Sequence, residues 1–267
     1  MDVFKFISPS LALIPFIRHY WILNVDTLYI SERITPIGCM QMVFHRGDRM
    51  YSLTENEMQP QTFIGGQSIG YLDLQSVGKI NMIVIVFQPH GVKPFFRMPM
   101  CDFLSRNVSI ADLEDKSLLE LEDRVLNAST DEHAIKLIEQ FLFLRLYDFD
   151  SYNYRRMGEV LKVIDNKNQL TVSSLSDAAC LSYKQFSRIF TEYVGATPKE
   201  FTRIVRFQRA LFMMQNNPSI DLMDLILTCG FYDQPHMIKE FKAFSGYTLN
   251  EYLAACQPYS DYFTLHS

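Results

Sequence analysis

The pattern of apolar and polar positions changes character twice along the chain. From residue 1 to about residue 110, apolar residues form short runs separated by turn residues, and Ile80–Phe87 is the longest of these runs. Such runs, partly β-branched and bounded by Gly or Pro, predict β-strands. Met40–Leu53 predicts a hairpin with its turn at Gly47 and Asp48. We therefore expect a β-rich N-terminal domain over 1–110, a small cupin-like barrel or sandwich.

Helical periodicity replaces this pattern between residues 113 and 147, where a helical hairpin is predicted. Its second helix starts near Thr130 and is apolar over much of its circumference. Such a helix needs more than one packing partner. One alternative is that it packs on both its hairpin mate and the β-rich domain; the other is that it also joins two copies of the chain. The second alternative predicts a homodimer formed through the N-terminal half.

Residues 148–154 are polar and rich in tyrosine, without clear periodicity, and are predicted to be a linker. Everything beyond them is predicted to be helical. Together these patterns predict an α+β chain of two domains, with a sensor and dimerisation domain over 1–147 and an all-α domain over 155–257.

Within the helical domain, the segment from Leu175 to Phe201 is repeated from Leu225 to Tyr252. Phe190 and Phe241 are 51 residues apart, as are Gly195 and Gly246. Each copy consists of a short helix, a turn and a longer helix with one apolar face. The repeat predicts two helix-turn-helix units, at about 171–194 and 221–245, joined by a long helix that begins at Pro198.

The outward faces of the second helices carry the expected DNA contacts. A helix that enters the major groove must be apolar inside and bear long hydrogen-bonding side chains outside. Arg188 can donate two hydrogen bonds to guanine and Gln185 can pair with adenine, each worth roughly 1–3 kcal/mol of discrimination. In the first unit the candidate DNA-binding residues are Tyr183, Lys184, Gln185, Ser187 and Arg188.

In the second unit, Asp233 is expected to be the N-cap residue. The candidate DNA contacts there are Gln234, Pro235, His236, Lys239 and Lys242. Arg155, Arg156 and Arg206 are candidate phosphate contacts, although Arg206 could instead lock the two lobes together. For each of these residues the alternative is a helix face that meets only solvent.

These residues resemble the DNA-binding domain of the AraC/XylS family. The matching stretches are Ser182-x-x-x-Phe186-Ser187-Arg188-x-Phe190, Gly195-x-Thr197-Pro198, Gly230-Phe231-Tyr232-Asp233 and Gly246-Tyr247-Thr248. The resemblance covers roughly residues 155–256. It implies a sequence-specific transcription regulator, probing two successive major grooves of promoter double-stranded DNA. It also implies an attached sensor domain; an activator role, with RNA polymerase as a further partner, is the working hypothesis.

Some positions depart from the family pattern. Leu249 stands where proline is usual, Lys239 replaces an arginine and Ile238 replaces a small polar residue. Lysine donates hydrogen bonds but cannot form the bidentate pair that arginine makes with a base. The second unit is therefore expected to recognise bases less specifically. The first half is only loosely similar to uncharacterised sensor domains of such regulators, so its ligand stays unassigned.

The net charge of −5 is unevenly divided. Residues 1–154 carry 13 Lys and Arg against 19 Asp and Glu, a balance of −6, whereas residues 155–257 carry 12 against 10, a balance of +2. The acidity thus belongs to the N-terminal half, and the mildly basic half is the one that carries the repeat. A basic balance favours nucleic acid as the partner.

Other function classes find less support in the sequence. A cupin-type metal enzyme needs histidines at ligand spacing, which His19, His45 and His90 do not show. A cysteine-based alkyl-damage sensor needs charged partners around Cys39 or Cys101. We therefore expect no enzyme activity, no metal and no cofactor. A regulator controlled by a protein partner, without a small-molecule effector, remains an open alternative.

The aromatic residues of the first half could line a small-molecule pocket or simply pack in the core. Both alternatives apply to Tyr20, Trp21, Phe44, Phe63, Phe87, Phe95 and Phe96. No apolar run reaches the ~18 residues of a membrane span, and the N-terminus lacks the pattern of a secretory signal. The five scattered cysteines are typical of a reducing compartment. The expected location is therefore the cytoplasm, at the nucleoid.

Overall fold

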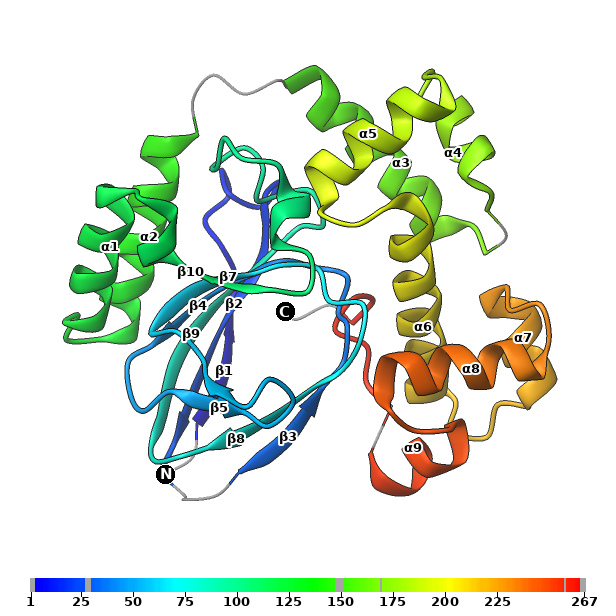
Figure 1. The fold of residues 1–267 in the computed structure, drawn as a ribbon, viewed down its shortest axis with the longest axis horizontal. Helices are drawn as coiled ribbons and strands as arrows, with labels where there is room; N and C mark the ends of the chain where they lie inside the picture. The colour runs from blue at the N-terminus through cyan, green and yellow to red at the C-terminus, as the bar shows by residue number, and fades with distance from the viewer. Residues whose placement is uncertain (1–2, 27–29, 147–150, 169, 257, 265–267) are drawn as a thin grey trace.

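The computed structural model describes residues 3–26, 30–146, 151–168, 170–256 and 258–264. A β-rich N-terminal region and a helical C-terminal region lie side by side, and a helical hairpin flanks the β-rich region on its other side (Figure 1). This arrangement confirms the predicted α+β fold class.

The N-terminal region contains two antiparallel sheets. The six-stranded sheet has the order β1 (Val3–Ile7), β2 (Ile17–Val25), β9 (Ile80–Phe87), β4 (Gln41–His45), β7 (Thr62–Gly65) and β10 (Asn107–Ser109). The four-stranded sheet has the order β3 (Ser31–Ile34), β8 (Leu72–Ser76), β5 (Met50–Ser52) and β6 (Glu57–Met58). The predicted strand at Ile80–Phe87 is confirmed as β9, which lies inside the larger sheet and is buried except at Asn81.

The predicted hairpin at Met40–Leu53 is wrong, because β4 and β5 belong to different sheets. The backbone N–H of Gly47 donates to the carbonyl of Asn81 at 2.9 Å, and that of Asp48 donates to the carbonyl of Lys79 at 2.9 Å. The turn is therefore bonded to Asn81 at the start of β9 and to Lys79 in the connection from β8, which crosses between the two sheets. Local sequence indicated the turn correctly, but the strand partners are set by long-range pairing.

The helical hairpin is confirmed as α1 (Lys116–Leu126) and α2 (Asp131–Arg145), with Asp115 and Thr130 as N-caps. Arg145 Nη1 lies 2.6 Å from Asp115 Oδ2, an ion pair that ties the end of α2 to the start of α1. Leu144 is 79% exposed, so part of the wide apolar face of α2 is uncovered in a single chain. The homodimer stays a prediction.

Helix α3 (Ser151–Asn166) starts four residues earlier than expected, so residues 151–154 are helical and the linker prediction is wrong there. The remaining predicted linker positions, 148–150, lie outside the described residues. Tyr154 explains the difference. Its hydroxyl donates to the carbonyl of Pro15 at 2.6 Å, and its ring stacks on His90 with centroids 4.2 Å apart. Packing on the N-terminal region thus stabilises a helical turn that has no local periodicity.

The C-terminal region continues with α4 (Val172–Ala178), α5 (Tyr183–Val194), α6 (Pro198–Asn216), α7 (Leu222–Cys229), α8 (Gln234–Ser245) and α9 (Leu249–Ala255). The turn between α4 and α5 places Cys180 at a φ of 53°, and the turn between α7 and α8 places Gly230 at 78°. Helix α9 begins at Leu249 with a capping box of Thr248 and Glu251, which supplies a start signal in place of proline.

The two helix-turn-helix lobes have different cores. The first lobe shares one continuous apolar core with the β-rich region, whereas the second lobe packs around Phe207, Phe241 and Phe244 as a separate cluster. Helix α5 also contacts the short helix η1 (Met100–Phe103) of the N-terminal region. The first lobe is therefore docked on the β-rich region, and α6 carries the second lobe away from it.

His90, buried against α3, should make the protein sensitive to acid. Burial lowers the pKa of His90 from 6.5 to about 4. A histidine with a lowered pKa stabilises the folded state above pH 6.5, and that stability is lost as the pH falls from 6.5 toward 4. We expect His90→Phe, which keeps the ring against Tyr154, to remove about 2 kcal/mol of the stability loss between pH 7 and 5.

Urea unfolding at the two pH values measures this effect. His133→Phe is the matched control, because His133 is exposed near the start of α2. An unchanged pH dependence in His90→Phe would contradict the prediction.

Candidate DNA-binding surface

Helix α5 presents one apolar and one polar face. Phe186, Ile189, Phe190, Tyr193 and Val194 are buried, and the Ser182 hydroxyl caps the helix by accepting from the backbone N–H of Gln185 at 3.4 Å. Tyr183 is 60% exposed, and the side chain of Arg188 is 71% exposed. Lys184 and Gln185 are also exposed, and Ser187 is half-buried. The structure therefore brings the five residues predicted in this unit to the accessible side of one helix.

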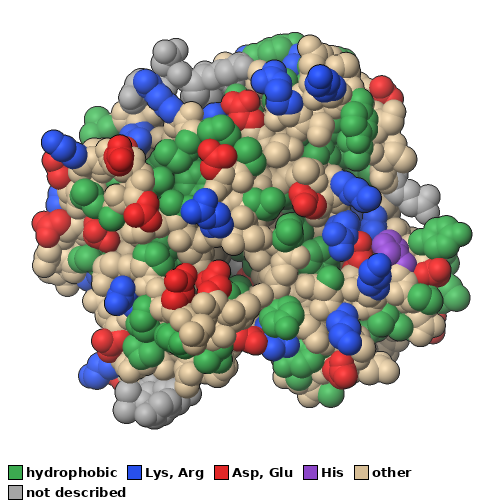
Figure 2. All heavy atoms as spheres, in the orientation of Figure 1, with side chains coloured by type: hydrophobic (Ala, Val, Ile, Leu, Met, Phe, Trp, Pro, Cys, Tyr) green, Lys and Arg blue, Asp and Glu red, His purple; other side chains and the backbone are tan. Residues whose placement is uncertain are grey.

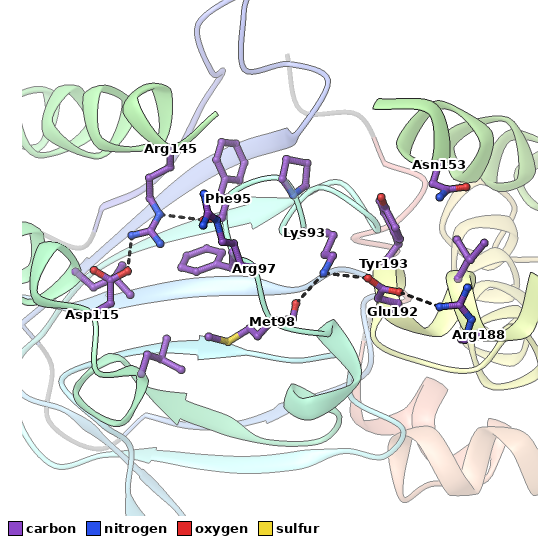
Figure 3. Close-up of a pocket in the computed structure, with 15 residues that line it drawn as sticks. Lys93, Phe95, Arg97, Met98, Asp115, Arg145, Asn153, Arg188, Glu192 and Tyr193 are labelled. Carbon is purple, nitrogen blue, oxygen red and sulfur yellow. Dashed lines mark hydrogen bonds and ion pairs between the residues drawn. The ribbon is translucent and has the colours of Figure 1, made fainter. Parts of the chain in front are cut away.

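A carboxylate controls the surroundings of Arg188. Glu192 Oε1 lies 3.1 Å from Lys93 Nζ of the N-terminal region, and Glu192 Oε2 lies 4.0 Å from Arg188 Nη1 (Figure 3). These groups border a pocket of about 650 Å³ between the two regions. Lys93 and Glu192 were not among the residues predicted from the sequence, because their pairing links segments far apart in the chain.

The N-terminal region also reaches the outward side of α5. Pro99 and Cys101 line a crevice of about 550 Å³ together with Tyr183, Lys184 and Arg188. At the end of α5, a side chain placed at Gly195 would come within 3.0 Å of the carbonyl of Met100. The recognition face of the first unit thus adjoins the β-rich region instead of standing apart from it.

Helix α8 begins as expected. The Asp233 carboxylate accepts from the backbone N–H of His236 at 2.8 Å, and Pro235 lies in the first turn, where its missing N–H leaves no bond unmade. Gln234, Pro235, Lys239 and Lys242 are exposed. Figure 2 shows Lys and Arg side chains gathered over the C-terminal helices on the face that it presents.

His236 and Arg206 each contact a carboxylate of the protein, Glu240. His236 Nδ1 accepts from the backbone N–H of Tyr232 at 3.2 Å, so Nε2 carries the proton and faces Glu240 Oε1 at 3.3 Å. Arg206 Nη1 lies 3.3 Å from Glu240 Oε2, with its guanidinium over the ring of Phe231. Both side chains therefore have partners within the protein, while 34% of the His236 side chain and 20% of the Arg206 side chain stay exposed. The contact of Arg206 links α6 to α8, the alternative that the sequence had left open.

Glu240, which sequence reasoning missed, organises this cluster. It is 3% exposed and also accepts from Arg203 Nε at 2.7 Å. A buried carboxylate with three basic partners holds the second recognition helix against α6. The spacing of four between His236 and Glu240, opposite a stripe of arginines, was the available signal.

The other predicted phosphate contacts lie at the start of α3. Arg155 is exposed, and its Nε donates to the carbonyl of Ser151 at 3.2 Å. Arg156 is half-buried and donates to Asn153 Oδ1 at 3.2 Å. Asn153 and Arg188 line the same pocket, so the start of α3 adjoins the first recognition helix.

Cys39 and Cys101, the two candidates for a reactive cysteine, lack the lowered pKa of such a site. Burial raises the pKa of Cys39 to about 11, and burial raises the pKa of Cys101 as well. A nucleophilic cysteine requires the opposite shift, so this arrangement disfavours a cysteine-based damage sensor. Over the described ranges no cluster of metal-binding side chains occurs, and none of the described helices has the length and apolarity to cross a bilayer.

Comparison with known families matches two separate parts of the chain. Residues 5–109 match a domain of unknown function, DUF6597, and residues 175–255 match a helix-turn-helix domain. These matches coincide with the two sheets and with the two repeated helical units.

Curated relatives match parts of the chain. An uncharacterized HTH-type transcriptional regulator of Haemophilus influenzae is 26% identical over 158 residues, 58% of this chain and 51% of that protein. The HTH-type transcriptional regulator ArgR of Pseudomonas aeruginosa is 34% identical over 83 residues, 31% of this chain and 25% of that protein. The chain thus spans about half or less of the length of these relatives.

Similar solved structures include ToxT from Vibrio cholerae, at 12% identity and a TM-score of 0.44, over 89% of this chain and 98% of that one. An AraC-type DNA-binding domain protein from Chromobacterium violaceum aligns at 21% identity and a TM-score of 0.36, over 41% of this chain and 100% of that one.

Proposed function

We propose that this chain, whose residues 175–255 form a helix-turn-helix domain of the AraC type, is a sequence-specific DNA-binding transcription regulator. The observation that carries the proposal is the pair of recognition helices, α5 and α8, each with a buried apolar face and an exposed polar one. Helix α6, which joins the lobes, has 19 residues and is therefore about 28 Å long. That length suits two helices in successive major grooves, about 34 Å apart.

The two units would contribute unequally. Arg188, Lys184 and Gln185 would recognise bases, with Tyr183 and Ser187 at the phosphate backbone. Gln234, Pro235, Lys239 and Lys242 would anchor α8, and Arg155 and Arg156 would add phosphate contacts. His236 and Arg206 would position α8 without touching DNA themselves. Lys239 cannot form the forked pair that arginine makes with guanine, so most of the specificity should come from α5.

The organisation of the whole protein follows from this assignment. The N-terminal region would receive a signal and pair two copies of the chain, and the helical region would activate transcription by placing RNA polymerase at a promoter. Such a regulator acts on the chromosome in the cytoplasm and needs no catalytic activity of its own. A protein partner that contacts the N-terminal region would serve as the signal if no small molecule does.

Selection of bound sequences from random duplex DNA tests the proposal directly. The expected result is an enriched motif with two half-sites about one helical turn apart. Affinity for the motif should fall steeply with salt, because each phosphate contact releases counterions, with a slope near −0.9 per contact. Binding that selects no motif and falls with salt no faster than that of a neutral control protein would refute the assignment.

The interdomain carboxylate offers a further prediction. Replacing Glu192 with glutamine removes a negative charge beside Arg188 and breaks the ion pair with Lys93. We expect the affinity for the selected DNA to rise by about two- to five-fold at low salt, since a carboxylate near phosphate is repulsive. Fluorescence anisotropy of labelled duplex measures the change. Glu120→Gln, on the exposed side of α1, is the control, and a lower affinity in Glu192→Gln would contradict the prediction.

A further inference from the structure

A large cavity lies between the two sheets of the N-terminal region. Its volume is about 770 Å³, the size of a small-molecule site. Phe6, Trp21 and Phe63 line it from the six-stranded sheet, and Ile34, Leu72 and Leu74 line it from the four-stranded sheet. Trp21 and Phe63 therefore line this cavity, although Phe63 is also part of the buried core. Tyr20, Phe44 and Phe87 are buried in the core, and the buried Phe95 and Phe96 line the pocket of about 650 Å³ between the two regions.

Apolar side chains that are exposed to solvent gather at this cavity. Phe4 is 58% exposed, Ile34 38% and Tyr71 37%, and each of them lines it. Leaving such surface in water is unfavourable by about 25 cal/mol per Å², so exposed apolar side chains that line one cavity favour a binding site there. The space-filling view shows the molecule hollowed near its centre, with acidic side chains beside the hollow (Figure 2).

The charged groups of the lining are mostly acidic. Three carboxylates (Glu32, Glu55 and Asp261) face one guanidinium, Arg106. Arg106 is exposed and donates to the backbone carbonyl of Asp102 at 3.4 Å. Among the described residues, neither Glu32 nor Asp261 has an ion-pair partner within 4.0 Å. The charged lining is therefore mostly acidic. The half-buried cation Arg18 does not line the cavity; its guanidinium donates to the carbonyl of Tyr262 and acts on Asp261.

Two of the lining carboxylates, Asp261 and Glu32, have raised pKa values. Burial raises the pKa of Asp261 to about 6, the effect of Arg18 being opposed by that of Glu32. The surrounding atoms also raise the pKa of Glu32 by partial desolvation, although Glu32 is an exposed residue of β3. A cation placed between the two carboxylates would relieve both their lost hydration and their mutual repulsion.

We propose that this cavity binds an organic cation, an amine or ammonium on an aromatic or aliphatic body, with Glu32 and Asp261 as its counter-charges. The aromatic walls favour such a ligand in two ways. They bury its apolar body, and the faces of Trp21 and Phe6 attract the positive charge. A carboxylate ligand would instead meet two like charges in a partly dehydrated site.

Asp261 gives this site a connection to the helical region. It lies on the C-terminal tail that follows α9 and returns to the β-rich region. The hydroxyl of Ser260 donates to Gln208 Oε1 of α6 at 2.9 Å, and the hydroxyl of Tyr262 donates to Asp165 Oδ1 of α3 at 2.8 Å. The tail residues on both sides of Asp261 are thus bonded to the helices that carry the lobes.

Glu32 has an equivalent connection through the next residue of β3. Arg33 pairs with Asp73 at 2.6 Å and donates to the carbonyl of Ser245, at the end of α8, at 3.2 Å. Its guanidinium also lies 4.5 Å from the ring centre of Tyr247. A ligand held by both carboxylates would therefore be connected, through these hydrogen bonds, to α3, α6 and α8. The inference that ligand binding changes the affinity for DNA rests on the proposed function, whereas the inference of the ligand site does not.

Trp21 provides a direct test, because it is the single tryptophan of the chain and lines the cavity. The probes are 2-phenylethylammonium, the neutral 3-phenylpropan-1-ol and the anionic 3-phenylpropionate, at neutral pH. The expected result is a saturable change in tryptophan fluorescence with the amine, at about ten-fold lower concentration than with the alcohol. An alcohol or a carboxylate that binds as tightly as the amine would overturn the proposal.

Neutral replacements supply the second arm. In the double variant Glu32→Gln, Asp261→Asn, affinity for the amine should fall about ten-fold while affinity for the alcohol is unchanged, which also shows that the cavity is intact. Glu57→Gln, an exposed carboxylate on β6 outside the cavity, should behave as the unaltered protein. If the double variant no longer binds the alcohol, its cavity has been lost and the variant does not test the carboxylates. The relative affinities of the unaltered protein for the three probes then decide whether the proposal holds. A retained amine preference in an alcohol-binding double variant overturns the proposal.

DNA binding is then measured with and without saturating amine. A changed affinity in the unaltered protein, absent in Asp261→Asn, supports the connection through the tail. An unchanged affinity with the amine bound overturns that connection alone. Failure of the protein to bind any DNA in the absence of amine bears instead on the proposed function.

Discussion

Replacing Arg188 with alanine is expected to abolish discrimination between the selected DNA motif and a scrambled duplex at the half-site that α5 contacts. Arg188 is the one arginine on the outward face of α5, and its side chain is 71% exposed. A forked arginine–guanine pair is worth about 1–3 kcal/mol, which corresponds to a loss of about five- to 150-fold in affinity for the motif. Affinity for scrambled DNA should fall far less.

The measurement is a pair of titrations, motif and scrambled, at one salt concentration. Arg188→Lys separates charge from geometry, because lysine retains the attraction to phosphate but cannot form the forked pair. It should therefore lose specificity while keeping most of the non-specific affinity. Arg124→Ala, an exposed arginine on α1, is the matched control. Equal losses on motif and scrambled DNA would assign Arg188 to the phosphate backbone instead.

Replacing Glu240 with alanine is expected to destabilise the second helix-turn-helix lobe by about 3 kcal/mol, the low end of the cost of removing one partner of a buried ion pair. Glu240 is 3% exposed, and its loss would leave Arg203 and Arg206 without their carboxylate against an apolar core. The estimate is at the low end because the side chains of Arg203 and Arg206 are 35% and 20% exposed, so water screens part of the penalty.

Urea unfolding monitored by circular dichroism measures this change. Glu240→Gln should be less costly, since the amide oxygen still accepts a hydrogen bond from one arginine. Glu120→Ala, an exposed glutamate on α1, should leave stability within about 0.5 kcal/mol of the unaltered protein. If Glu240→Ala matched that control, the cluster around Glu240 would be dispensable for stability, contrary to expectation.

Specificity and stability should therefore separate at the two recognition helices. Arg188 is expected to affect which DNA is bound without changing the fold. Glu240 is expected to affect both DNA binding and stability, because its buried contacts with α6 position α8. Loss of DNA binding in Glu240→Ala should accordingly be restored in part by lowering the temperature, whereas the loss of discrimination in Arg188→Ala should not be.

The sequence by itself determined the parts of this protein that depend on local interactions. The spacing of Phe186, Ile189 and Phe190, the caps at Ser182 and Asp233, and the glycines that end the helices act within one or two turns. The repeat of this pattern was sufficient to predict the helical domain and the outward residues of α5. The apolar run that forms β9 was equally decisive, since a strand inside a sheet carries few polar positions.

Only the tertiary structure decided the features that join distant segments. It placed β4 and β5 in different sheets, extended α3 through Tyr154, and brought His236 and Arg206 to Glu240. It also brought Lys93 to Glu192, and Asp261 to a cavity that Glu32 also lines. The physical reason is common to all of these: each depends on burial and charge contributed by residues far away in the chain, which no local periodicity encodes.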